Sequence, residues 1–260
     1  MASLEEIRDE RLKKLAILKE KGIDPYPAIS KKDHSLSEIV ENFDELSKKE
    51  SVTLVGRIMS LRGQGAIIFF NFYDGTANFQ GLFKKGDIED ASLGLFSEVA
   101  DIGDFIEVTG SLFITKRGEK TILVKDWKML AKSLRPLPGE YYGFKDEEER
   151  LRKRYLDILM NKDIRDMFYK RSKFWMTIRN FLIEKGFLEI ETPVLENTPG
   201  GAEARPFITH HNALDMDVFL RISAGELWQK RLMVAGFPKV FEIGRIFRNE
   251  GMDAEHLQDY

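Results

Sequence analysis

Hydrophobic and polar residues alternate in short runs between residues 52 and 130, and β-branched and aromatic residues are frequent in these runs. A period of two places successive side chains on opposite faces of a strand, and turns that contain glycine separate the runs. A helical stretch near residues 88–100 interrupts the series. The pattern therefore predicts five strands, at 52–61, 66–73, 77–83, 104–115 and 120–130.

Five strands with a helix between the third and the fourth are typical of a small Greek-key barrel such as the OB-fold. A surface helix is expected ahead of this barrel. Ser3 and Glu6 have the spacing of a capping box at the start of this helix. Its helical pattern is rich in charged residues and ends at Gly22.

Proline and glycine mark the predicted borders of the domains. Pro25 and Pro27 end the helical region, and a polar linker with one helical turn is expected at 31–50. A hinge, Leu134-Arg-Pro-Leu-Pro-Gly139, follows the barrel. We expect a helix and linker at 1–50, the barrel domain at 51–135 and a second domain at 136–260.

The second domain is predicted to be α+β, because helical and extended patterns alternate along it. Its longest helix is amphipathic and ends at Gly186 as a C-cap; its bulky stripe is formed by Phe174, Ile178, Phe181 and Leu182. The other expected elements are a charged helix at 145–154, a strand from Phe187 stopped by Pro193, a strand at 218–222, a helix at 225–235 and a strand at 240–248.

Composition narrows the class of protein. The 260 residues are 43% hydrophobic and 32% charged, and the longest apolar run covers only residues 66–70, so we expect a soluble globular protein without membrane spans. The net charge of -3 excludes a general polycation. The lack of cysteine excludes disulfides and thiolate chemistry, and four histidines leave little room for a histidine-rich metal centre. The first residues lack an apolar signal segment, which predicts a cytoplasmic location.

One face of the second strand is a candidate nucleotide site. Alternation places Phe69 on the face opposite the core, where it can lie beside Gln80 of the third strand, with Arg62 in the preceding loop. An exposed ring, an amide and a cation are suited to an unstacked base. The alternative is an aromatic strand buried on both faces. A local net charge of +5 over residues 115–135 favours phosphate contact, although most such runs are only solvated.

A second candidate lies in Phe247-Arg248-Asn249-Glu250-Gly251, where a spacing of two places Arg248 and Glu250 on one face of a strand. A guanidinium can bind a phosphate, and a carboxylate can accept a hydrogen bond from the amino group of adenine. Together they could bind ATP, and His256 and Tyr260 could extend this site. The alternative is an ordinary Arg/Glu salt bridge.

Glu226 opens a predicted helix and could bind an ammonium group, although a pair with Lys230 is the simpler interpretation. Gly200 and Gly201 allow a ligand to approach the backbone closely, or simply form a turn. His210 and His211 are expected to point to opposite sides, which makes them a poor metal pair.

The amino-acid sequences of several segments, and their order along the chain, resemble those of the bacterial-type class II lysyl-tRNA synthetases over essentially the whole chain. Gly186-Phe-x-Glu-x-x-x-Pro193 is similar to class II motif 1, and Phe247-Arg-Asn-Glu-Gly251 is similar to motif 2. The stretch Pro199-Gly-Gly-Ala-x-Ala-Arg-Pro-Phe-Ile-Thr-His-His-Asn-Ala-Leu214 favours the lysine enzymes over the related aspartate and asparagine enzymes.

The resemblance implies a role for each candidate residue. In the barrel, Phe69 would stack on the central anticodon uridine of tRNA(Lys), and Gln80 would contact this base, assisted by Arg62 and Asp126. In the second domain, Gly201 and Glu226 would bind L-lysine, and Arg248 would be the catalytic group that bridges the lysine carboxylate and the α-phosphate. Glu250, His256 and Tyr260 would bind ATP, and the motif 1 helix would form a homodimer interface.

The implied reaction is the ATP-dependent formation of lysyl-adenylate, followed by lysine transfer to tRNA. The resemblance also implies Mg²⁺, whose ligands are expected beyond residue 260. The chain is expected to end within motif 2, with the returning strand and motif 3 outside it, and so to lack catalytic competence by itself. The chain departs from the family in two places: the segment Ser223-Ala-Gly225 is longer, and the residues that follow His256 are different. The alternative functions are a non-enzymatic OB-fold nucleic-acid-binding module and an aspartate or asparagine synthetase.

Overall fold

The computed structural model describes residues 3–64, 66–138, 146–251, 253 and 256–260. The chain forms two compact units, Met1–Met160 and Asn161–Tyr260, which are treated separately below. Gly139, the last residue of the predicted hinge, lies outside the described residues.

The first unit begins with helix α1 (Leu4–Glu20), and the side chains of Ser3 and Glu6 form the predicted capping box. The expected polar linker contains two short helices, α2 (Leu36–Glu41) and α3 (Phe43–Leu46). Leu36, Ile39, Phe43 and Leu46 are buried in the main hydrophobic cluster. This segment is therefore part of the core, because its few apolar residues pack against the barrel, as Phe43 does on Phe79 with 6.5 Å between ring centroids.

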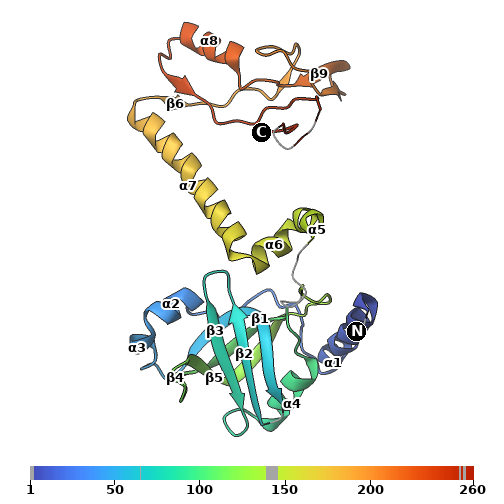
Figure 1. Cartoon of the computed structure of the whole chain (residues 1–260), viewed down its shortest axis with the longest axis vertical. Helices are drawn as coiled ribbons and strands as arrows, with labels where there is room; N and C mark the ends of the chain where they lie inside the picture. The colour runs from blue at the N-terminus through green and yellow to red at the C-terminus, as the bar shows by residue number, and fades with distance from the viewer. Residues whose placement is uncertain (1–2, 65, 139–145, 252, 254–255) are drawn as a thin grey trace. The chain divides into compact units, whose positions relative to one another are not determined.

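The five predicted strands form a closed barrel (Figure 1) in the order β1-β2-β3-β5-β4. β3 and β5 pair in parallel and the other neighbours pair antiparallel. Helix α4 (Asp90–Val99) follows the third strand, as the pattern predicts. The OB-fold expectation is confirmed; the strands are β1 (Val52–Gln64), β2 (Ile67–Tyr73), β3 (Asn78–Lys84), β4 (Phe105–Ile114) and β5 (Lys120–Ala131).

Aromatic side chains fill the barrel core. Phe70, Phe72 and Phe83 are buried, as the alternation along β2 and β3 predicts. The rings of Phe70 and Phe83 pack with that of Phe96 from α4, and the ring of Phe72 packs with that of Phe70. A Cβ atom on Gly81 would lie 2.0 Å from the ring of Phe70, so only glycine leaves room for this ring. The core therefore depends on one glycine beside a cluster of phenylalanines.

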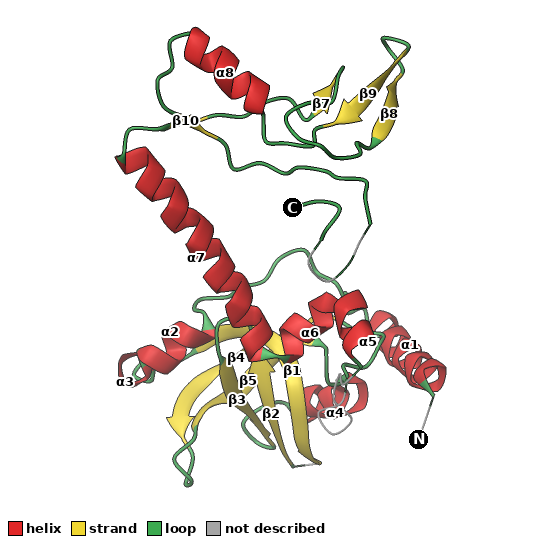
Figure 2. Cartoon of the chain, turned by 45° about the horizontal axis from the view of Figure 1, so that its top comes forward, coloured by secondary structure: helices red, strands yellow, loops and turns green. Residues whose placement is uncertain are grey.

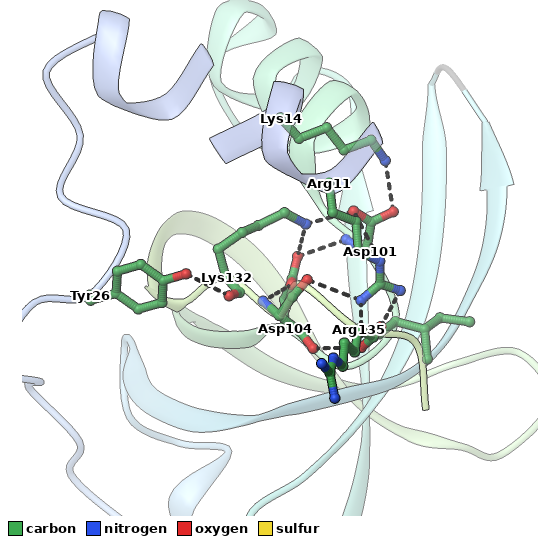
Figure 3. A network of polar contacts seen from close by, with 9 residues as sticks. Arg11, Lys14, Tyr26, Asp101, Asp104, Lys132 and Arg135 are labelled. Atoms are coloured by element: carbon green, nitrogen blue, oxygen red, sulfur yellow. Dashed lines mark hydrogen bonds and ion pairs between the residues drawn. The ribbon is translucent and has the colours of Figure 1, made fainter. Parts of the chain in front are cut away.

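A buried ionic network joins α1 to the barrel (Figure 3). Nζ of Lys132 lies 2.6 Å from Asp101 and 2.7 Å from Asp104, and the side chains of Lys132 and Asp104 are 0% exposed. The guanidinium of Arg11 donates hydrogen bonds to the backbone oxygens of Ile102, Ser133 and Arg135. Burial raises the pKa of Asp104, while hydrogen bonds from Lys132 and Lys14 outweigh burial and lower the pKa of Asp101.

Two helices complete the first unit: α5 (Glu147–Arg152) and α6 (Arg154–Met160). The predicted charged helix is therefore followed at once by a second one. Asp157 is buried, and its carboxylate accepts hydrogen bonds from Arg150 at 3.0 Å and Arg154 at 2.7 Å. These two ion pairs neutralise a charge that burial would otherwise make costly.

The second unit opens with the predicted long helix, α7 (Lys162–Glu184), after which Gly186 takes a positive φ of 79°. Its sheets are small (Figure 2): a parallel pair, β10-β6, and a three-stranded antiparallel sheet, β7-β9-β8. The bounds are β6 (Leu188–Glu189), β7 (Leu195–Glu196), β8 (Ile208–His211), β9 (Met216–Leu220), α8 (Glu226–Val234) and β10 (Val240–Phe241). The expected strand at 240–248 is thus reduced to β10 and a bridge between Phe247 and Asp259. Within the described ranges, no helix is long and apolar enough to cross a membrane.

Candidate functional site

On the barrel, the strand register brings Arg62 and Phe69 together. They are direct partners in the β1–β2 pair, so their side chains lie on the same face of the sheet. Phe69 is half-buried between the fully buried Ile68 and Phe70. The expectation of Arg62 in a loop is wrong, because β1 continues through Gln64 to meet β2. The ladder therefore holds the cation opposite the ring.

Gln80 is held on the neighbouring strand. It pairs with Asn71 on β2 and with Thr121 on β5, and Asn71 lies two residues from Phe69 on the same face of the strand. Oγ1 of Thr121 donates a 2.8 Å hydrogen bond to Oε1 of Gln80. The structure thus places a cation, a ring and an amide on three successive strands.

Asp126 is exposed farther along the barrel. It pairs with Thr109 on β4, next to a register shift, and lies five residues from Thr121 along β5, a distance of about 15 Å. The register does not pair it with Arg62, Phe69 or Gln80.

The basic run after residue 115 is smaller at the surface than its sequence indicates. Lys132 is buried in the ionic network, and Nζ of Lys128 donates to the backbone oxygen of Ile29. Nζ of Lys120 donates to the backbone oxygen of Val40 and lies 5.1 Å from the ring centroid of Phe43. The interpretation of the whole run as a phosphate-facing patch is therefore wrong for Lys132, whose charge is used inside the unit.

In the second unit, residues 246–248 pair with the last residues of the chain. The backbone N–H of Arg248 donates to the oxygen of Gln258 at 2.8 Å, and Ile246 and Tyr260 exchange backbone hydrogen bonds. The guanidinium of Arg248 lies 5.6 Å from the ring centroid of Tyr260, and its Nε is 3.4 Å from the oxygen of Ile222. The returning strand therefore begins within the chain, and the expectation that it lies wholly outside is wrong.

Glu250 makes contacts different from those of Arg248. The backbone N–H of Asn249 donates to the oxygen of Arg205 at 2.7 Å, and Oε1 of Glu250 accepts from the N–H of Arg205 at 3.3 Å. The segment around Arg205, from the glycine-containing stretch, thus lies beside residues 249 and 250.

Gly201 and Glu226 also lie together. A Cβ atom on Gly201 would lie 2.2 Å from Oγ of Ser223 and 3.1 Å from Oε2 of Glu226, and Gly201 has a positive φ of 87°. Only glycine fits this approach. Oε1 of Glu226 is 3.1 Å from Nζ of Lys230, so the simple ion pair weighed as an alternative is present. The other carboxylate oxygen faces the glycine loop.

The same unit contains a buried ionic cluster that the sequence analysis missed. Nη1 of Arg221 lies 2.5 Å from Oε1 of Glu242, and each side chain is 3% exposed. Oγ1 of Thr192 donates to the same carboxylate at 2.7 Å. The available signal was one arginine at the end of an apolar run, Val218-Phe-Leu-Arg-Ile222. Its partner, 21 residues away, has no local signal.

His256 is exposed, and its Nδ1 lies 2.9 Å from both carboxylate oxygens of Asp253. Nδ1 of His210 is 3.2 Å from Asp217. Among the residues with described positions, no group of three or more His, Cys, Asp or Glu side chains is placed to hold a metal ion.

Two protein families match parts of this chain. Residues 52–130 match the family of the OB-fold nucleic acid binding domain, and residues 146–260 match the family of tRNA synthetases class II (D, K and N). The chain is 48% identical to the lysine–tRNA ligase of Pelotomaculum thermopropionicum; the aligned region covers 99% of this chain and 50% of the relative.

Two further relatives are similar at nearly the same level. The lysine–tRNA ligase of Clostridium botulinum is 46% identical over 98% of this chain and 50% of its own length. The lysine–tRNA ligase of Carboxydothermus hydrogenoformans is 46% identical over 99% of this chain and 52% of its own length. The chain spans about half the length of these curated relatives. By the family match of residues 146–260 and the similarity to these relatives, it belongs to the class II tRNA synthetases of the aspartate, lysine and asparagine group.

Proposed function

We propose that this chain provides the anticodon-binding barrel and part of the catalytic domain of a cytoplasmic lysine–tRNA ligase. The observation that carries the proposal is the similarity to lysine–tRNA ligases along nearly the whole chain. Two contacts in the second unit support it: Gly201 lies beside Glu226, and Nε of Arg248 lies 3.4 Å from the oxygen of Ile222. L-lysine, ATP and tRNA(Lys) are the proposed substrates.

The proposed first step joins lysine to AMP. The lysine carboxylate attacks the α-phosphorus of ATP, the bond to the β-phosphate oxygen breaks, and lysyl-adenylate and pyrophosphate form. Arg248 would bridge the two reacting anions and reduce their repulsion. Glu226, whose Oε2 faces the Gly201 backbone, would bind the α-amino group of lysine, and Gly201 would let the substrate approach closely.

In the same proposal, Glu250 accepts a hydrogen bond from the adenine amino group, and Tyr260, already beside the Arg248 guanidinium, lies against the base. His256 approaches the distal phosphates. Mg²⁺ would neutralise phosphate charge when bound with ATP. The second step transfers the lysyl group to the 3′-terminal ribose of tRNA and releases AMP.

A homodimer is part of this proposal, and α7 supports it. Within this chain none of the residues of α7 is buried, and Phe174 and Phe181 of its bulky stripe are more than half exposed. An apolar stripe on a 23-residue helix is typical of a surface that a second copy covers.

The charging assay tests the proposed activity. The product of the complete reading frame that contains these residues should attach lysine, and neither aspartate nor asparagine, to tRNA in an ATP-dependent reaction. The same preparation should sediment as a dimer. Charging with aspartate or asparagine, or none at all, would contradict the assignment to lysine.

Replacing Phe69 by Ala should weaken binding of an anticodon hairpin of tRNA(Lys) by about 1–3 kcal/mol, because one base loses its stacking surface. Fluorescence anisotropy with the full chain measures this loss. Ile67→Ala is the matched control, since Ile67 is an exposed apolar residue of the same strand. Equal affinities for the F69A variant and the unchanged chain would remove the ring from the proposed site.

A further inference from the structure

Thr121 is buried beside Gln80, and its hydroxyl has two oxygen neighbours. The hydrogen bond to Oε1 of Gln80 is 2.8 Å long, and the backbone oxygen of Glu119 lies at 3.1 Å. Thr121 is 0% exposed, so no bulk water competes for its hydroxyl.

A hydroxyl has a single proton, so it can donate fully to only one of these oxygens. The oxygen of Glu119 already accepts a 2.9 Å hydrogen bond from the backbone N–H of Thr115. The contact to Gln80 is also the shorter one. The hydroxyl of Thr121 therefore donates its proton to Oε1 of Gln80.

This hydrogen bond orients the Gln80 amide. With Oε1 held by Thr121, the planar amide presents its Nε2 group, a donor, away from Thr121. Gln80 is half-buried, and the strand register places it on the face of the sheet that carries Phe69 and Arg62. A donor there can bind a base carbonyl such as O4 of uracil, and it opposes the amino group of cytosine, which is also a donor.

We propose that Thr121 is a positioning residue that makes the barrel selective for a keto base over an amino base at the Phe69 stacking position. The inference rests on the proposed anticodon-binding function. Without the threonine hydroxyl, the amide of Gln80 can turn and offer Oε1 instead, so a cytosine amino group would then be accepted.

The test compares the affinities of the full chain for anticodon hairpins that differ only in the central base, uridine or cytidine. The unchanged chain should prefer uridine. Thr121→Val, which keeps the shape but removes the hydroxyl, should reduce the ratio of the two affinities by about 3- to 10-fold, mainly through better cytidine binding. Thr121→Ser keeps the hydroxyl and should retain the ratio within about twofold.

The outcomes separate the inference from the proposed function. No preference for uridine in the unchanged chain, with no effect of Phe69→Ala, would contradict anticodon reading by the barrel and the inference with it. A normal preference that Thr121→Val leaves intact would overturn the inference alone. Equal weakening of both hairpins by Thr121→Val would also overturn it, because a merely structural role moves both affinities together.

Discussion

Replacing Lys132 by Met should lower the free energy of unfolding of the barrel unit by about 3–5 kcal/mol, because the change leaves the buried carboxylate of Asp104 without its counter-ion, whereas Asp101 keeps Lys14. Lys132 contacts both Asp101 and Asp104, and neither Lys132 nor Asp104 has exposed side-chain area. Urea unfolding followed by circular dichroism measures the loss. Lys125 is an exposed lysine of β5, the strand that ends just before Lys132, and Lys125→Met should change this free energy by less than about 0.5 kcal/mol.

The pH dependence distinguishes a lost ion pair from a packing defect. Burial raises the pKa of Asp104, and Lys132 opposes this effect. Without Lys132, the pKa of Asp104 in the folded chain should rise further above its value in the unfolded chain. The folded state then binds the proton more tightly, so the K132M variant should regain stability relative to the unchanged chain as the pH falls. A deficit that stays constant from neutral to acidic pH would contradict this explanation.

Replacing Arg221 by Met should cost the second unit about 3–5 kcal/mol of unfolding free energy, because Glu242 would then be buried with an unpaired charge. Arg221 also donates to the backbone oxygen of Arg245 at 2.7 Å, and its own oxygen accepts from the N–H of Phe247. It therefore connects the end of β9 to the segment at residues 245–247, next to Arg248. The loss should appear in a urea unfolding curve.

Arg245→Met provides the control for this variant. Arg245 lies in the same segment, but it is exposed and forms a surface ion pair with Asp259, which is worth about 0–1 kcal/mol. If R245M and R221M lose the same stability, the buried cluster does not support this unit. The double variant Arg221→Met with Glu242→Gln should recover part of the loss, since it removes the unpaired charge.

The barrel was largely predictable, because a half-buried strand has to alternate and each turn here contains glycine. The face assignments of Phe69 and Phe70 and the end of α7 at Gly186 follow from such local rules. One helical turn was expected in the linker at 31–50, whereas two helices form at 36–46. The helical content was underestimated because only a few apolar residues pack this segment onto the barrel, and the sequence around them is polar. The length of β1 was underestimated, because its last residues are held by pairing with β2 rather than by their own pattern.

The sequence by itself determined the alternation that builds the barrel, the caps and glycines that end its helices, and the motifs that resemble the lysine enzymes. Only the tertiary structure decided that Lys132 is an internal counter-ion, that Arg221 pairs with Glu242, and that Thr121 holds the amide of Gln80. The physical reason is distance along the chain. A periodic pattern reports which face of an element is buried, whereas the partner of a buried charge or hydroxyl lies 21 to 41 residues away and is set by strand register and packing.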